Sequence, residues 1–319
     1  MIAESYGNHQ YALVADIGGT NTRFALTTGE VIDSSSVQRF ENARISDLNS
    51  AIEDYLRECN SPAPQEACIA VAGPVAQNRA ELTNRDWDIV GQDVSDRLGG
   101  IPVYLINDLQ AVGYGLHRLR KNDLMPLFQG SHEAGNRQLA INAGTGFNAV
   151  AVHHVDGHYL AAPSECGHTS LPHGNREVEM LRQHIESRNG FASVEDILSG
   201  RGAKMVDHWT RQTCDAADKT ASETYHRILA ETLGAITRDL TLTHLPFGGI
   251  FLTGGVGRGI ASQLNHSGFV ESFLSAGRFS EFMRQFSIHL ICDDQVALKG
   301  CAVCLGQQLP AGDDISDRD

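Results

Sequence analysis

Long apolar runs, an even set of cysteines and an excess of basic residues are all absent from this chain of 319 residues. It has no stretch of 18 apolar residues, so we expect no membrane-spanning helix. The first ten residues are polar, and we expect no hydrophobic core of a secretion signal there. Lys and Arg number 25 against 39 Asp and Glu, and the resulting net charge of −14 disfavours a nucleic-acid partner.

The seven cysteines are odd in number and irregularly spaced, which is typical of a reducing compartment. We therefore expect a cytoplasmic location. The one close pair, Cys301 and Cys304, lies in an apolar, helix-like stretch without a second pair. Packing in a core is therefore favoured over a metal or redox role for this pair.

Two familiar nucleotide-binding signatures are also missing. Gly-x-x-x-x-Gly-Lys-Ser/Thr does not occur, which excludes the P-loop class. A glycine-rich segment at residues 254–259 follows a strand-like run, but no suitably placed acidic residue comes after it, so a dinucleotide site is disfavoured. Contact with a nucleotide base or ribose, or close packing of a helix on a sheet, is favoured there instead.

Two Gly/Thr turns, far apart in the chain, each separate a pair of strand-like runs. The first is in residues 16–21, Asp-Ile-Gly-Gly-Thr-Asn, and the second is in residues 143–146, Ala-Gly-Thr-Gly. Such turns offer backbone N–H groups and hydroxyls with no Cβ in the way, which suits a phosphate chain. One such hairpin could be only a turn, but the pair predicts two related halves that grip phosphates. Asp16, at the end of the first strand, is well placed to hold water around Mg²⁺.

Three polar groups stand where apolar segments end, and together they suit a polyol acceptor. They are Asn107-Asp108, the pair Glu165 and His168, and Glu195. Carboxylates accept hydrogen bonds from neighbouring hydroxyls, amides and imidazoles donate or accept, and one carboxylate can deprotonate the attacking hydroxyl. The alternatives are a helix cap for Asn107-Asp108, a first-turn position for Glu195 and an ordinary loop position for His168.

The motifs and their order along the chain resemble those of bacterial ATP-dependent glucokinases of the hexokinase-like group, in the actin-like ATPase superfamily. The matching segments are residues 16–23, 83–87, 105–108, 143–146, 165–168, 198–200 and 252–255. Strands alternating with helices already indicate an α/β fold in two halves. The resemblance implies the two-domain actin-like ATPase (ribonuclease H-like) fold with a cleft between the domains. It also implies a small domain, residues 1–117 with about 296–319, and a large domain, residues 118–295.

The resemblance further implies a reaction and a role for each motif. ATP would give its γ-phosphoryl group to the 6-hydroxyl of glucose, yielding glucose 6-phosphate and ADP, with Asp108 as the base and Asp16 organising Mg²⁺ through water. The other expected sugar contacts are Asn84, Asn107, Glu165, His168 and Glu195. The expected nucleotide contacts are Gly18, Gly19, Thr20, Asn21, Gly144, Thr145, Gly254 and Gly255. A homodimer without nucleic-acid or membrane partners is expected.

Three segments depart from the family pattern: Cys166 replaces Gly, Phe147-Asn148 replaces Leu-Gly, and Arg201 replaces a frequent Pro. The cysteine-rich zinc motif of repressor-related sugar kinases is missing, so we expect no structural zinc. The alternatives are an actin-like kinase for mannose, fructose or an N-acetylated amino sugar, an actin-like ATPase that moves a partner, and a sugar-binding regulator. The polar acceptor set disfavours the second of these, and Asp108 with both Gly/Thr turns disfavours the third.

Overall fold

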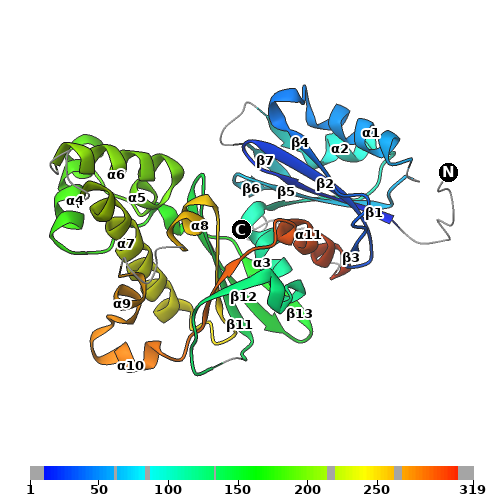
Figure 1. The fold of residues 1–319 in the computed structure, drawn as a ribbon. Coiled ribbons are helices and arrows are strands. Elements are labelled where there is room, and N and C mark those ends of the chain that lie inside the picture. Colours follow the sequence, from blue (N-terminus) through cyan, green and yellow to red (C-terminus); the bar gives the residue numbers. More distant parts are fainter. Residues whose placement is uncertain are drawn as a thin grey trace, which may run out of the picture. The chain divides into compact units, whose positions relative to one another are not determined.

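The computed structural model describes residues 11–60, 63–82, 87–132, 134–213, 220–261 and 268–307 (Figure 1). The chain divides into two compact units, Met1–Leu119 with Asp294–Asp319, and Arg120–Asp293. No described helix is both long and apolar enough to cross a membrane.

The sheet of the first unit places its polar strand ends along one edge. Its order is β3 (Val31–Ile32), β2 (Asn21–Thr28), β1 (Tyr11–Ile17), β5 (Glu66–Val71) and β9 (Val103–Asn107), with β4 (Gln38–Glu41) also paired to β2. β1 and β2 form an antiparallel hairpin, whereas β1, β5 and β9 run parallel. Ile17 is level with Val71, and Val71 with Asn107, so the motifs after β1 and β9 share an edge.

Helices cover this sheet because their apolar residues recur at helical spacing. α1 (Leu48–Glu58) starts at Asp47, whose side chain accepts from the Ser50 N–H, and it buries Leu48, Ile52 and Tyr55. The remaining helices are α2 (Gly91–Arg97), α3 (Asp108–Gly115), α11 (Val296–Gly306), η1 (Asn42–Arg44) and η2 (Leu116–Arg118). β6 (Val75–Ala76), β7 (Arg79–Glu81) and β8 (Asp88–Val90) form a separate small sheet.

The C-terminal helix α11 belongs to the first unit, where it packs on α3, β1 and β5. It is buried almost all round, as expected for a helix that, apart from Lys299, consists of valine, alanine, leucine, glycine and cysteine. The side chains of Cys301 and Cys304 are both buried in this packing, and the six described cysteines are free thiols.

The sheet of the second unit repeats the plan of the first. Its order is β10 (Leu124–Phe128), β15 (Ile288–Ile291), β14 (Ile250–Thr253), β11 (Arg137–Ala143), β12 (Phe147–Val155) and β13 (His158–Ala162). β11 and β12 form an antiparallel hairpin, and β14 and β15 run parallel to β11. The series β12–β11–β14–β15 therefore matches β2–β1–β5–β9, as the two similar turns predicted.

The helices of the second unit enclose a large apolar core. They are α4 (Arg176–Asn189), α5 (Glu195–Leu198), α6 (Gly200–Thr213), α7 (Thr220–His244), α8 (Gly255–Ala261), α9 (Phe269–Leu274) and α10 (Ser280–Met283), with the short turns η3 (Lys121–Asp123), η4 (Cys166–His168) and η5 (Gly277–Phe279). The long helix α7 packs against α6 and α9 and buries Ile228, Leu233 and Ile236. These helices carry the residues that surround the second Gly/Thr turn.

Candidate functional site

The turn between β1 and β2 is braced from behind by Asn42, whose side chain is buried. The Gly18 N–H donates to the Asn21 carbonyl at 2.9 Å and closes the turn. Asn42 donates from Nδ2 to the Gly18 carbonyl at 2.7 Å and accepts at Oδ1 from Thr22 Oγ1 at 2.8 Å. Its own N–H donates to the Thr20 carbonyl at 2.9 Å. With two carbonyls engaged in this way, the exposed tip at Thr20 can offer N–H and hydroxyl groups to an anion.

Sequence reasoning missed Asn42, because a lone Asn after a strand reads as an ordinary turn or capping residue. Its role depends on the pairing of β4 with β2, which brings the start of η1 behind the turn.

Asp16 lies opposite Arg23 in the hairpin and forms an ion pair with it. The two residues are cross-strand partners, and Arg23 Nη1 is 3.1 Å from Asp16 Oδ2. Burial raises the pKa of Asp16, and the positive charge of Arg23 opposes this. Arg23 therefore orients the Asp16 carboxylate and partly offsets the cost of its burial.

Asn107 ends β9 and caps α3, as the capping alternative predicted. Its Oδ1 accepts from the N–H groups of Leu109 at 3.0 Å and Gln110 at 3.4 Å, and its Nδ2 donates to the Gly73 carbonyl at 3.0 Å. The Gln110 side chain in turn accepts from the Asn107 N–H at 3.3 Å, which completes a capping box. This network defines where α3 begins, and Asp108 is its first residue.

The carboxyl of Asp108 has an unusual proton affinity. Burial, followed by the nearby negative charge of Asp16, raises the pKa of Asp108 to about 7. The Leu109 N–H donates to Asp108 Oδ1 at 2.8 Å and opposes this rise only in part. A carboxyl with such a pKa can exchange a proton near neutral pH, which is the property of a general base or acid.

In the second unit, three chain segments meet at the second Gly/Thr turn. The Gly144 N–H donates to the Gly146 carbonyl at 2.9 Å, and the Gly200 N–H donates to the Gly144 carbonyl at 2.7 Å. Gly254 has a φ of +94°, and a Cβ there would lie 2.3 Å from the Ala143 carbonyl oxygen. Only glycine allows the end of β14 to approach the hairpin this closely. The predicted nucleotide residues of this unit thus share one edge of its sheet.

A cavity of about 400 Å³ lies beside this edge, between α6, α7 and α8. Gly200 and Gly255 line it, together with Lys204 from α6 and Tyr225 from α7. Glycine surfaces, an aromatic ring and polar side chains suit a nucleoside. Sequence reasoning missed the lining from α6 and α7, because helical spacing alone does not show which face borders a cavity.

Glu195 lies between the second Gly/Thr turn and η4. Its Oε2 accepts from the Phe147 N–H at 3.1 Å, and a Cβ at Gly167 would come within 3.5 Å of the same oxygen. Arg201 Nη2 lies 3.9 Å from Glu195 Oε1. Arg201, one of the three departures from the family pattern, therefore contacts a residue expected to bind the sugar.

Glu165 directly precedes η4 and His168 is its last residue, and both are exposed. The His168 N–H donates to the Glu165 carbonyl at 3.1 Å, which links the two residues across the turn. Between them, the Cys166 N–H donates to Asn148 Oδ1 at 3.3 Å, and Cys166 Sγ lies 3.5 Å from the same oxygen. Two further departures from the family pattern are thus in contact with each other.

The predicted residues therefore gather into two groups, one in each unit. Asp16, residues 18–21, Asn107 and Asp108 lie in the first unit, whereas Gly144, Thr145, Glu165, His168, Glu195, Gly254 and Gly255 lie in the second. Asn84 falls outside the described residues. Within the described ranges, no group of three or more His, Cys, Asp or Glu side chains is arranged to hold a metal ion.

The fold has solved relatives among sugar kinases. A glucokinase from an Antarctic psychrotroph aligns over 94% of this chain and 99% of its own, with a TM-score of 0.82 and 26% identity. A glucokinase from Balamuthia mandrillaris, solved in complex with glucose, aligns over 95% of this chain and 96% of its own, with a TM-score of 0.78 and 19% identity. The predicted actin-like ATPase fold is confirmed, and fold and site together define an actin-like sugar kinase.

Sequence comparisons identify the family of this chain within the actin-like sugar kinases. The family model for glucokinase matches residues 13–308. The glucokinase of Caulobacter vibrioides is 34% identical, with 94% of this chain and 97% of the relative covered. That of Nostoc punctiforme is 31% identical, with 92% and 98% covered. The chain belongs to the glucokinase family, and it is an ATP-dependent hexose kinase.

Proposed function

We propose that this protein transfers the γ-phosphoryl group of ATP to the 6-hydroxyl of glucose, with Asp108 as the general base. The observation that carries the proposal is the partly buried Asp108 carboxyl at the start of α3, whose pKa of about 7 suits proton transfer at neutral pH. Membership of the glucokinase family supports glucose as the acceptor and ATP as the donor.

Asp108 acts in its ionised form on the attacking hydroxyl. It accepts the hydroxyl proton as the bond from the sugar oxygen to the γ-phosphorus forms and the bond from that phosphorus to the bridging oxygen of ADP breaks. The capping box at Asn107 holds the first turn of α3, so the carboxylate needs little rearrangement before the reaction. We infer that Asn84, Asn107, Glu165, His168 and Glu195 bind the remaining sugar hydroxyls.

We propose that the two Gly/Thr turns hold the phosphates and that the α6–α8 cavity holds the adenosine. The turn residues in these roles are Gly18, Gly19, Thr20, Asn21, Gly144 and Thr145. Gly254 and Gly255 would border the adenosine. In this assignment backbone N–H groups and hydroxyls supply much of the contact with the phosphate oxygens.

Asp16 fits the role of holding Mg²⁺ through water. Asp16 and Asp108 are two partly buried carboxyls whose charges act on each other, and one arginine, Arg23, pairs with Asp16. This surplus of negative charge suits a divalent cation that keeps most of its own waters. When bound, Mg²⁺ would neutralise charge on the phosphates.

The pH dependence of kcat/KM should report the state of Asp108. Its pKa is raised, so the base is protonated and inactive below about pH 7 and ionised above it. We expect kcat/KM for glucose to fall about tenfold for each unit by which the pH drops below about 7. A profile measured at constant ionic strength that stays flat down to pH 5.5 would contradict the assignment.

The substrate assignment is tested by ADP release from ATP and Mg²⁺ with glucose, mannose, fructose or N-acetylglucosamine. We expect glucose to give the highest kcat/KM. A preference for another hexose would replace glucose as the proposed substrate. Cys166 contacts Asn148 and Arg201 lies near Glu195, so these departures from the family pattern lie beside residues that we expect to bind the sugar. ADP release without any sugar would instead indicate an ATPase.

We also propose a cytoplasmic homodimer. Six free thiols among the described cysteines support a reducing compartment. Val155 and Leu160, both more than half exposed on the β12–β13 edge of the second unit, support association through this edge. Sedimentation equilibrium would show a dimer mass, and a monomer at micromolar concentration would contradict the proposal.

A further inference from the structure

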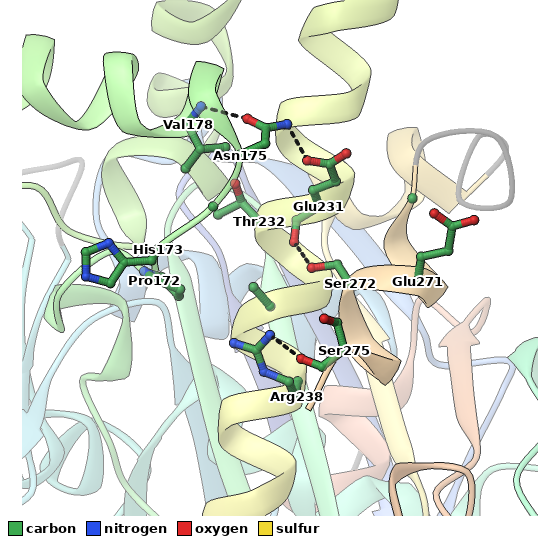
Figure 2. A pocket seen from close by; sticks show the side chains of 13 residues that line it. Pro172, His173, Asn175, Val178, Glu231, Thr232, Arg238, Glu271, Ser272 and Ser275 are labelled. Atoms are coloured by element: carbon green, nitrogen blue, oxygen red, sulfur yellow. Dashed lines mark hydrogen bonds between the residues drawn. The ribbon is translucent and has the colours of Figure 1, made fainter. Parts of the chain in front are cut away.

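Two cavities of about 400 Å³ lie in the second unit, and their positively charged side chains differ. Figure 2 shows the first, between α4, α7 and α9, where Arg238 Nη1 donates to the Ser275 carbonyl at 3.0 Å. Arg238 also pairs with Asp239 at 2.8 Å, so its charge is already compensated. Lys204, which lines the α6–α8 cavity, forms no hydrogen bond or ion pair with any residue that the structure describes. An unpaired positive charge at a cavity wall suits a ligand with a negative group.

Lys204 lies on the face of α6 that leads away from the second Gly/Thr turn. The helix begins at Gly200, whose N–H donates to the Gly144 carbonyl at 2.7 Å. The residues of α6 that line the cavity recur at helical spacing and share one face; they are Gly200, Ala203, Lys204 and Asp207. At a rise of about 1.5 Å per residue, Lys204 lies about 6 Å along the axis from Gly200. Its ammonium group is therefore about one helical turn from the proposed phosphate contacts at Gly144.

The other end of the cavity suits a nucleoside rather than a phosphate. Asp207 lies three residues beyond Lys204, and Arg211 Nε donates to both of its carboxylate oxygens at 3.0 Å. Burial raises the pKa of Tyr225 on α7, and the charge of Asp207 raises it further, so these two lining side chains are near each other. An aromatic ring can stack on a base, whereas a carboxylate repels a phosphate. A nucleotide held by the turn therefore passes Lys204 with its phosphates and reaches Tyr225 with its base.

Lysine supplies a full positive charge, which the two Gly/Thr turns lack. Residues 16–21 and 143–146 contain no Lys or Arg. A hydrogen bond from an ammonium group to a phosphate oxygen is roughly twice as strong as one between neutral groups. The net charge of −14 repels an anion, and a cation at the cavity wall offsets this locally. Asp207 is the acidic residue in the lining, and its pairing with Arg211 keeps it from cancelling the charge of Lys204.

We propose that the ammonium group of Lys204 binds the α-phosphate of the nucleotide, where the phosphate chain leaves the second Gly/Thr turn. This role rests on the proposed assignment of the α6–α8 cavity to the nucleoside. The α-phosphate is the one nearest the nucleoside, which matches the place of Lys204 between Gly200 and Tyr225. The γ-phosphate is two phosphates farther along the chain, so Lys204 binds the donor without contacting the bonds that form and break.

Isothermal titration calorimetry of the full-length protein with adenosine, AMP and ADP, without added Mg²⁺, tests this contact. AMP differs from adenosine only by the α-phosphate, and ADP adds the β-phosphate. We expect AMP to bind about tenfold more tightly than adenosine. Lys204→Met should weaken AMP and ADP about tenfold and leave adenosine unchanged, because methionine fills similar space without the charge. Lys204→Arg keeps the charge and should restore most of the AMP affinity.

Steady-state kinetics and a control variant separate this contact from a general effect of charge. Lys204→Met should raise the KM for ATP about tenfold and lower kcat by less than about threefold, because the γ-phosphate contacts remain. Lys121→Met makes the same charge change at an exposed position of η3, and should alter neither the KM for ATP nor the affinity for AMP.

Several results would overturn the assignment of Lys204. They are a parent enzyme that binds AMP no more tightly than adenosine, an unchanged AMP affinity in Lys204→Met, and equal weakening by Lys121→Met. Weakening of ADP alone would place the ammonium group at the β-phosphate instead, and equal weakening of adenosine would indicate damage to the cavity. Glucose-dependent ADP release by the parent is measured separately. Its absence would refute the proposed function, while the titrations with AMP would still decide the role of Lys204.

Discussion

Replacing Asp108 with Asn is expected to lower kcat by about 10³-fold, because the variant keeps the shape of the side chain but cannot accept the hydroxyl proton. The KM for ATP should change little, since the proposed phosphate contacts lie in other residues. Asn can still accept the Leu109 N–H that Asp108 accepts at 2.8 Å, so the first turn of α3 should form normally. Steady-state kinetics with saturating glucose measure the effect.

The same substitution should stabilise the folded protein above pH 7, and this separates loss of the base from damage to the fold. The pKa of Asp108 rises on folding from 3.8 to about 7, so the folded state binds this proton more tightly than the unfolded state. The contribution of this bound proton to the free energy of unfolding is complete below pH 3.8 and is lost as pH rises to 7. Above pH 7 the ionised carboxyl lowers the free energy of unfolding by on the order of 4 kcal/mol, which Asn avoids.

Urea denaturation at pH 8 measures this gain, and Asp54→Asn is the matched control. Asp54 is an exposed carboxylate of α1 paired with Arg57 at 2.7 Å, and its loss should alter neither kcat nor stability by much. An Asp108→Asn enzyme that keeps a tenth of its turnover, or that is less stable than the parent at pH 8, would refute the assigned role.

Replacing Gly300 with Ala is expected to destabilise the first unit by about 3 kcal/mol or more. A Cβ at Gly300 of α11 would lie 1.7 Å from the Ala111 carbonyl oxygen of α3, and a Cβ at Gly115 would lie 2.2 Å from the Val296 carbonyl oxygen. The two helices thus cross with their backbones in contact, and neither backbone can move aside without disturbing the buried core. Calorimetry should show the Tm lowered by on the order of 10 °C.

Gly306→Ala is the control in the same helix. There the added Cβ would meet only the flexible side chain of Glu30, at 3.0 Å, and alanine favours helix by up to about 1 kcal/mol. Its Tm should therefore change little or rise. Because α3 begins at Asp108, Gly300→Ala should also lower kcat. A Tm within 2 °C of the parent for Gly300→Ala would show that the helices can separate without loss.

Local sequence patterns were enough to predict the strand–turn–strand units and the related plan of the two halves. Glycine and threonine between apolar runs produce hairpins through short-range backbone geometry. The turns at residues 16–21 and 143–146 could therefore be predicted from the residues that form them. The cap at Asn107 is likewise local, because its partners Leu109 and Gln110 follow within three residues. The order of the motifs along the chain was enough to identify the family.

Properties that arise between distant segments were decided by the tertiary structure alone. Asn42 braces the first turn only because β4 pairs with β2, and Glu195 accepts from the Phe147 N–H only because α5 packs against β12. The pKa of Asp108 depends on burial and on the charge of Asp16, which the sheet brings close from far along the chain. Burial and electrostatic interaction depend on distance in space, and local sequence carries no record of that distance.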